Sequence, residues 1–323
     1  AKQVVLAAGG LQTARLLLTC QAQDATLFGG PNGALGRYYM GHLTGSVAEI
    51  HFRDAAHVGA FGYAPLGSTM ARRRIMLDPH HWANTAFWLE SVALNDPRHQ
   101  SGELSFKHLL ASRGRTADLL PHIRNVLTNP AGVPAGIKAA LERRFLPHAR
   151  YPNRLIARGP GPYRLAFHAE QRPLASNRVS LANEQDRFGC PKLKIDFHYD
   201  DETIWALVRD HRKLAEQLSG NGLADLTLPG SDDDMAEQIA RQSRDGYHQI
   251  GVCRMTDDPS TGIVDPDCKV WGIRNLYVAS AAVFPVGGQA NPTLSVVALA
   301  LRLAEHLRKS HIPSSPKEGT QLQ

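Results

Sequence analysis

Two side chains in the last quarter of this 323-residue chain pair a proton acceptor with a hydrogen-bond donor. His248 lies in the stretch YHQIGVCRM, and Asn291 lies in NPTLSVV. A neutral imidazole can take a proton near neutral pH, and a carboxamide N–H can donate to an oxygen that gains negative charge. The two residues are 43 positions apart (291 − 248), so only tertiary structure can bring them to one site. Because a histidine taken alone is more often structural, the pair is a hypothesis that depends on its surroundings.

The segment Asn291-Pro292-Thr293 also has a local function. Proline fits the first turn of a helix without losing a hydrogen bond, and the helical pattern TLSVVALALRLAEHL follows it. The free N–H groups and the positive end of this helix favour a negatively charged or electron-rich partner. The alternative is that Asn291 is an N-cap, a role that asparagine commonly fills, and both roles can coexist.

The elements that must position these residues alternate along the chain. QVVLAAGG (3–10) predicts a strand with a tight turn, and the helical spacing of LQTARLLLTCQA completes one βα unit of a parallel sheet. The stretch 29–42 is rich in turn residues and predicts a loop. Further strands are predicted at 46–52, 72–77, 85–94, 163–171, 177–181 and 192–199. Helices are predicted over roughly 103–148 and over 202–218. Asp200 or Asp201 can cap the second of these helices, and Gly220 and Gly222 would end it.

Composition excludes several classes of protein. The 43% hydrophobic content can bury a large core, and the Lys and Arg residues behind the net charge of +6 are spread out, so we expect no nucleic-acid partner. Four distant cysteines predict neither disulfides nor a zinc site and favour a reducing compartment. His80-His81 lacks an H-E-x-x-H context, so no metal site is expected. No apolar run reaches the roughly 20 residues of a membrane span.

One ordered series of residues occupies positions 246 to 308. Its members are His248, Gly251, Arg254, Met255, Val264-Asp265, Gly272, Asn275-Leu276-Tyr277-Val278, Phe284-Pro285 and Asn291-Pro292-Thr293. This series resembles the C-terminal signature of the glucose-methanol-choline (GMC) flavin oxidoreductases. In addition, 4–18 is similar to the family's strand and turn beside the adenosine half of FAD, 32–42 to its loop leaving the flavin domain, and 169–197 to its substrate-domain strands.

The resemblance implies FAD as cofactor, with His248 and Asn291 facing flavin N5 across the substrate. His248 would be the general base that takes the hydroxyl proton, Asn291 would donate to the developing alkoxide, and the flavin would take the hydride. The residues implied to contact the cofactor are Ala8, Gly9, Ser280, Ala281, Pro292 and Thr293. Ser280 departs from the acidic or glycine residue usual in the family, so a backbone N–H near Ala281 is the contact expected there.

The implied fold is α/β, with an incomplete parallel-sheet FAD-binding domain plus an α+β substrate domain that has a mainly antiparallel sheet. The expected ranges are 1–42 for the remaining part of the FAD-binding domain, 43–245 for the substrate domain, 246–308 for the returning FAD-binding and catalytic segment, and 309–323 for a disordered tail.

One family motif is missing from this sequence. No G-x-G-x-x-G follows a strand, although that turn holds the pyrophosphate in the family. Because the chain also opens at a strand, in AKQVVLAAGG, we expect its natural N-terminal portion to be missing or to lie on another chain. FAD binding would then need a complementing N-terminal polypeptide.

The function predicted is FAD-dependent oxidation of a small-molecule alcohol, such as a sugar or polyol, in the cytoplasm. Two alternatives stay open. One is an enzyme like the hydroxynitrile lyases of the same family, and the other is an inactive or split fragment that needs an N-terminal partner.

Overall fold

The computed structural model describes residues 2–77, 84–145, 155–156, 159–242 and 248–310, and these fall into two compact units. Unit 1 consists of residues 1–42, 170–200 and 244–323, and unit 2 of residues 43–169 and 201–243. The stretch 170–200, which the sequence analysis assigned to the substrate domain, therefore groups with the segments at the two ends of the chain. His80-His81 and residues 311–323 of the expected tail lie outside the described residues.

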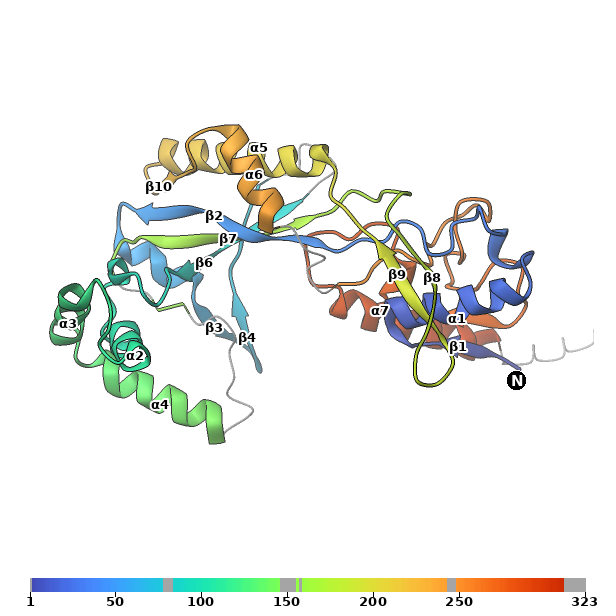
Figure 1. Ribbon diagram of the computed structural model, residues 1–323, viewed down its shortest axis with the longest axis horizontal. Helices are drawn as coiled ribbons and strands as arrows, with labels where there is room; N and C mark the ends of the chain where they lie inside the picture. The colour runs from blue at the N-terminus through green and yellow to red at the C-terminus, as the bar shows by residue number, and fades with distance from the viewer. Residues whose placement is uncertain (1, 78–83, 146–154, 157–158, 243–247, 311–323) are drawn as a thin grey trace, which may run out of the picture. The chain divides into compact units, whose positions relative to one another are not determined.

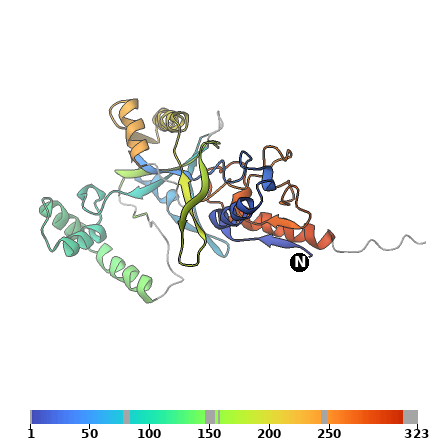
Figure 2. The ribbon, with the colours of Figure 1, turned by 45° about the vertical axis from the view of Figure 1, so that its right-hand side comes forward.

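Unit 1 contains a parallel pair of short strands. β1 (Val4–Leu6) pairs with β11 (Leu276–Val278), and Val4 lies opposite Leu276. β1 leads into helix α1 (Gly9–Gln23), which confirms the predicted βα unit, and β11 precedes the short helix η5 (Ala281–Val283). Helix α7 (Thr293–Ser310) ends the described part of the chain, and Figure 2 shows it together with α1 and β1.

The core of unit 1 joins segments far apart in the sequence. Its buried side chains come from α1, from the loop 34–39, from 252–283 and from α7. The antiparallel hairpin of β8 (Arg178–Gln185) and β9 (Pro191–Asp196) is attached to this core through Val179. Burial of these apolar side chains is the main source of stability for the loop segments that carry the candidate residues.

Unit 2 is built on a five-stranded sheet with the order β10-β2-β7-β6-β5 (Figure 1). The β10–β2, β6–β7 and β5–β6 pairs are antiparallel. The strands are β2 (His42–Phe52), β5 (Ile75–Met76), β6 (Thr85–Ser91), β7 (Tyr163–Glu170) and β10 (Ala224–Thr227). Figure 1 shows helices α5 (Asp201–Gly220) and α6 (Asp232–Gln242) along one face of the sheet. A separate hairpin joins β3 (Tyr63–Leu66) to β4 (Thr69–Arg72).

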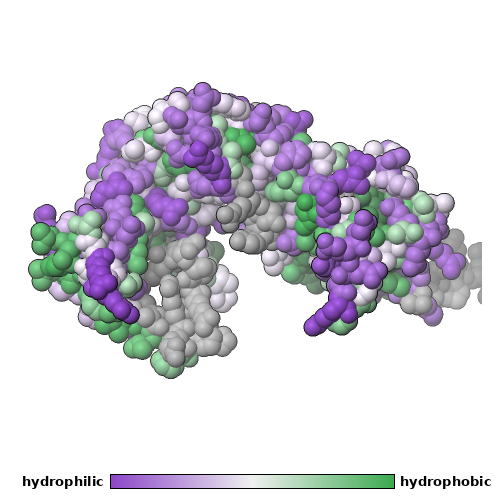
Figure 3. All heavy atoms as spheres, in the orientation of Figure 1, coloured by the Kyte–Doolittle hydropathy of each residue, from purple (hydrophilic) through white to green (hydrophobic). Residues whose placement is uncertain are grey.

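The three remaining helices of unit 2 pack on one another. They are α2 (Gly102–Ser112), α3 (Leu119–Thr128) and α4 (Gly132–Phe145), which together cover most of the predicted helical stretch 103–148. Helix α3 buries His122 and Asn125 and exposes Leu120 and Leu127, and Figure 3 shows apolar side chains gathered over it. This is the reverse of the usual arrangement, in which the apolar stripe of a helix faces the core.

The predicted fold class is confirmed, with a small parallel sheet in unit 1 and a mainly antiparallel sheet with helices in unit 2. Within the described ranges, no helix has both the length and the apolar character that a membrane crossing requires.

Candidate functional site

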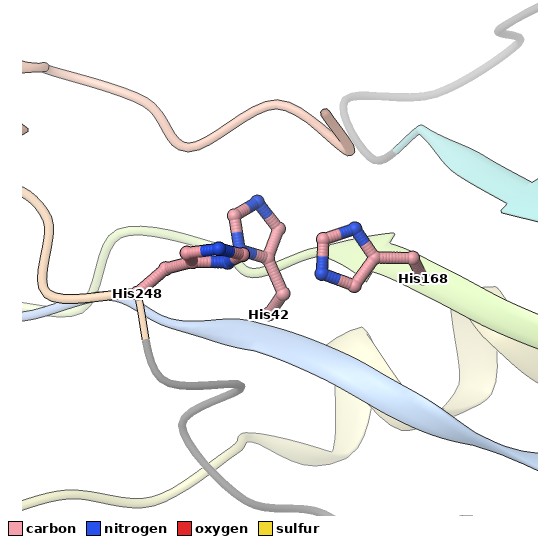
Figure 4. A group of neighbouring side chains, drawn as sticks. All are labelled: His42, His168 and His248. Carbon is pink, nitrogen blue, oxygen red and sulfur yellow. The ribbon is translucent and has the colours of Figure 1, made fainter. Parts of the chain in front are cut away.

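His42 and His248 form the centre of the candidate site in unit 1. Their Nδ1 atoms are joined by a hydrogen bond of 2.8 Å. Their rings stand edge to face, with centroids 4.7 Å apart. Figure 4 shows the two rings together, with His248 coming from the loop segment and His42 from the start of β2. His42 is fully buried, whereas His248 is partly exposed, so only His248 combines an ordered ring with access to a small molecule. The third labelled residue, His168, lies on β7 and belongs to unit 2.

Backbone pairing brings the two histidines together. Met40 and Ile250 exchange two backbone hydrogen bonds, at 3.0 and 3.1 Å, two residues away from His42 and His248 respectively. Gly251 follows in a left-handed conformation, with φ of +90°, and a Cβ there would lie 2.3 Å from the carbonyl oxygen of Tyr38. The close approach of these two segments therefore requires glycine at position 251.

The loop that precedes α7 holds the other end of the His42 ring. Nε2 of His42 is 2.9 Å from the carbonyl oxygen of Gly288, and the backbone N–H of Gly288 donates to Oε1 of Glu170 at 3.1 Å. Glu170 is buried, and Gly288 has φ of +59°, which favours glycine. One peptide segment thus connects a buried carboxylate to the ring that contacts His248.

Asn291 follows Gly288 by three residues, so it belongs to the loop that contacts His42. Its side chain is exposed and forms no hydrogen bond within the described part of the chain. The carbonyl of Pro292 accepts the first helical bond of α7 from Val296 at 2.9 Å, so Pro292 occupies the capping position instead of Asn291. The N-cap alternative for Asn291 therefore has no support, and its side chain is available to a ligand.

Four of the predicted cofactor residues lie at one edge of the parallel strands. Ala8 and Gly9 follow β1, whereas Ser280 and Ala281 follow β11, and the backbone N–H of Ala279 donates to the Leu6 carbonyl at 2.8 Å. The carboxyl ends of adjacent parallel strands are where open α/β sheets bind ligands. The Ser280 hydroxyl accepts from the N–H of Ala282, so its side chain caps η5.

This edge is connected directly to the segment of His248. Gly10 packs on the backbone of Gln249, and the N–H of Gly251 donates to the Ala281 carbonyl at 3.3 Å. The backbone N–H of Cys253 extends this pairing by donating to the Ala282 carbonyl at 2.8 Å. The predicted cofactor edge and the predicted base are therefore parts of one packed structure within unit 1.

Cys253 is a packing residue. Its side chain is fully buried, and this burial raises the pKa of the thiol to about 12. The thiol is therefore neutral at physiological pH and is not a nucleophile. Next to it, the guanidinium of Arg254 lies 4.6 Å from the centroid of the Tyr38 ring, a cation–π contact between the same two segments that Gly251 joins.

Sequence reasoning did not single out His42, Glu170 or Gly288. Their hydrogen bonds join residues separated by 206, 246 and 118 positions, and no local pattern indicates such pairings. The one available signal was that His42 ends a loop, 32–42, that already resembles a family segment.

The comparisons with known proteins agree with this structure. A C-terminal family model described as GMC oxidoreductase matches residues 173–300. The chain is 32% identical over 133 residues to paromamine 6'-oxidase of Streptomyces fradiae, covering 41% of this chain and 23% of that protein. It is 23% identical over 314 residues to 2-methyl-1,2-propanediol dehydrogenase of Mycolicibacterium austroafricanum, covering 96% of this chain and 48% of that protein.

A third relative is the oxygen-dependent choline dehydrogenase of Brucella ovis, 29% identical over 158 residues, which are 45% of this chain and 28% of that protein. The matches thus span less than half the length of each of these relatives. Among solved structures, pyridoxine 4-oxidase from Mesorbium loti is similar with a TM-score of 0.50 and 16% identity, covering 96% of this chain and 52% of that one, which supports the fold alone. The family model thus identifies residues 173–300 as a C-terminal GMC oxidoreductase region, and over nearly its full length the chain is similar to the dehydrogenase of Mycolicibacterium austroafricanum.

Proposed function

We propose that this protein takes part in the FAD-dependent oxidation of a small-molecule alcohol, with His248 as the general base. The observation that carries the proposal is the hydrogen bond of 2.8 Å from partly exposed His248 to fully buried His42, since it orders an imidazole that still faces solvent. A general base needs both a fixed position and access to the proton that it removes.

The chemistry divides between the cofactor and the side chains. Oxidising an alcohol removes a hydride from carbon and a proton from oxygen, and FAD supplies the hydride acceptor when it is bound. His248 takes the hydroxyl proton onto its ring. The exposed carboxamide of Asn291 donates to the same oxygen and holds it in line.

The residues at the cofactor edge suit a group that approaches the backbone closely. Gly9 is exposed with φ of +76°, and no atom lies within 4 Å of where its Cβ would be. Ala8 and Ala281 are also small, and Pro292 directly precedes Thr293, the first residue of α7, whose first-turn N–H groups suit an electron-rich ring. These residues would contact the cofactor mainly through their backbone.

A complementing N-terminal polypeptide belongs to the proposal, because the sequence has no G-x-G-x-x-G turn after a strand. Val4 and Val5 of β1 are exposed, as are Leu294, Val297 and Leu301 of α7. Parallel strands are normally covered on both faces, so these side chains suit contact with further polypeptide that carries the phosphate-binding turn.

The names of the relatives support an alcohol as substrate, because 2-methyl-1,2-propanediol and choline both carry a hydroxyl group. A primary or secondary alcohol, such as a sugar or polyol, is therefore the substrate class that we propose.

The test combines reconstitution with substitution at His248. The chain is purified with a polypeptide that contains the phosphate-binding turn, flavin absorbance is recorded, and a panel of alcohols is assayed with artificial electron acceptors. His248→Gln should keep the flavin and lose about 10²–10⁴-fold in turnover. The control is His57→Gln, which alters an exposed histidine of unit 2 and should leave turnover unchanged.

Full activity of the His248→Gln protein would rule out His248 as the base. Cleavage of a cyanohydrin without any electron acceptor, combined with no alcohol oxidation, would instead support the lyase alternative.

A further inference from the structure

We infer that His42 is a positioning residue that fixes the tautomer of His248, so that the proton of the neutral His248 ring lies on Nδ1 and its lone pair on Nε2. The catalytic meaning of this inference rests on the proposed function. The tautomer itself does not, because it follows from hydrogen bonds within unit 1.

The argument begins at the carbonyl of Gly288. A carbonyl oxygen can only accept, so the ring nitrogen that lies 2.9 Å from it, Nε2 of His42, must carry a hydrogen. In a neutral imidazole the other nitrogen then has none. Nδ1 of neutral His42 is therefore an acceptor.

The second step moves from His42 to His248. Two nitrogens 2.8 Å apart form a hydrogen bond with one hydrogen between them. Since Nδ1 of His42 is the acceptor, Nδ1 of His248 must be the donor. The lone pair of neutral His248 is then on Nε2, the nitrogen that can accept a proton from a substrate hydroxyl.

The orientation of the His42 ring is fixed at both ends. Turning the ring by half a turn would place carbon atoms at both nitrogen positions, and both hydrogen bonds would be lost. The backbone at His42 is held as well, because the hydroxyl of Tyr199 donates to its carbonyl at 3.1 Å and the N–H of Gly41 donates to Oε1 of Gln171 at 2.8 Å. His42 is also fully buried, so solvent does not compete for its nitrogens.

The acceptor for the Gly288 N–H completes the arrangement. Oε1 of buried Glu170 accepts at 3.1 Å and so holds the backbone of Gly288, whose own carbonyl is the acceptor for Nε2 of His42. A series of hydrogen bonds thus connects Glu170 to Gly288, Gly288 to His42 and His42 to His248, and it determines where the proton of His248 lies. This ordering corresponds to the role of the residue behind the histidine in a catalytic triad, here filled by a neutral ring.

Two amide substitutions at position 42 test the hydrogen bonds of the two ring nitrogens one at a time. Oδ1 of asparagine can take the position of Nδ1, so His42→Asn keeps an acceptor for His248. The amide N–H of glutamine reaches the position of Nε2, so His42→Gln keeps the donor to Gly288 and loses the acceptor. The two proteins therefore have the same functional group and differ in the contact that the inference requires.

The test is NMR of the histidine ring nitrogens in the flavin-free full chain at about pH 8, where free imidazole is neutral. His248 is assigned by the loss of its signals in His248→Gln. In the unsubstituted chain Nδ1 should carry the hydrogen and Nε2 the lone pair. His42→Asn should retain this pattern. His42→Gln should lower the ratio of the Nδ1–H tautomer to the Nε2–H tautomer about 5-fold, as expected for the loss of one neutral hydrogen bond.

A hydrogen on Nε2 of His248 in the unsubstituted chain would overturn the inference, and so would identical tautomer ratios in the asparagine and glutamine proteins. If neither variant folds, the spectrum of the unsubstituted chain alone decides. In the reconstituted enzyme, kcat should fall about 10-fold in His42→Gln with KM unchanged and recover in His42→Asn. Absence of alcohol oxidation in the unsubstituted enzyme would contradict the proposed function and leave the tautomer result standing.

Discussion

Gly10 and Gln249 lie so close that a Cβ on Gly10 would be 2.3 Å from the carbonyl oxygen of Gln249. This contact joins the start of α1 to the residue that follows His248. The turn after β1 and the candidate base therefore share one packing contact, and the position of one limits the position of the other.

Gly10→Ala should destabilise unit 1 and displace the His248 segment. The new methyl group meets a backbone carbonyl, which cannot rotate away, and overpacking of this kind costs about 1–3 kcal/mol. Urea denaturation measures the free energy of unfolding. Gly59→Ala is the matched control, because nothing lies within 4 Å of its Cβ position, and it should change stability by less than about 0.5 kcal/mol. Equal stability of the two variants would contradict this packing.

Gly288→Ala should be destabilising for a conformational reason. Its φ of +59° lies in the left-handed region, which costs a residue with a side chain about 1–2 kcal/mol, although no atom lies within 4 Å of the Cβ position. Gly288→Asn should cost less, since asparagine tolerates this region. Thermal denaturation checks the order of the three proteins. The neighbouring change Gly287→Ala makes only ordinary contacts of 3.8–3.9 Å and should be nearly neutral.

The four cysteines should fall into two reactivity classes. Cys20 and Cys190 are exposed, whereas Cys253 and Cys268 are buried and burial raises the pKa of both thiols. Alkylation of the folded chain followed by mass spectrometry should therefore label Cys20 and Cys190 first, since the thiolate is the reactive form. In denaturant all four should react. Rapid labelling of Cys253 in the folded chain would show that its segment opens readily.

Acid should destabilise the chain through His211. This histidine packs between Phe87 and Phe167, and burial lowers its pKa from 6.5 to about 4. As the pH falls below about 6.5, the unfolded chain binds a proton that the folded chain excludes, so the stability present above that pH is lost progressively. The loss should approach about 3 kcal/mol near pH 4.

Urea denaturation at several pH values measures the His211 effect. Replacement by leucine, His211→Leu, removes the titrating group and should flatten the decline between about pH 6.5 and 4. An unchanged acid limb in that variant would assign the decline to other groups, such as His99, whose pKa burial also lowers.

Much of the local structure followed from periodicity in the sequence. The βα unit at 3–18, the strand at 85–94 and the amphipathic helix after Asp201 were predicted from the spacing of apolar residues, and the structure contains all three. Such patterns depend on neighbours within a few turns or strand positions, so one sequence is enough to show them.

The resemblance to the GMC family could also be recognised from the sequence, because the motifs that resemble it follow one another in order between 246 and 308. Asn291 was predicted beside the start of α7, although Pro292, and not Asn291, occupies the N-cap position of that helix. Which residue supplies a cap depends on backbone geometry that residue types alone do not determine.

What only the tertiary structure decided is the environment of His248. His42 precedes His248 by 206 positions and Gly288 by 246, and three segments must fold together before their polar atoms are within hydrogen-bonding distance. The proton position on an imidazole is set by the partner of its other nitrogen. The sequence by itself therefore determined that an imidazole, the predicted base, stands at position 248, and the fold determined which hydrogen-bond partners its ring meets.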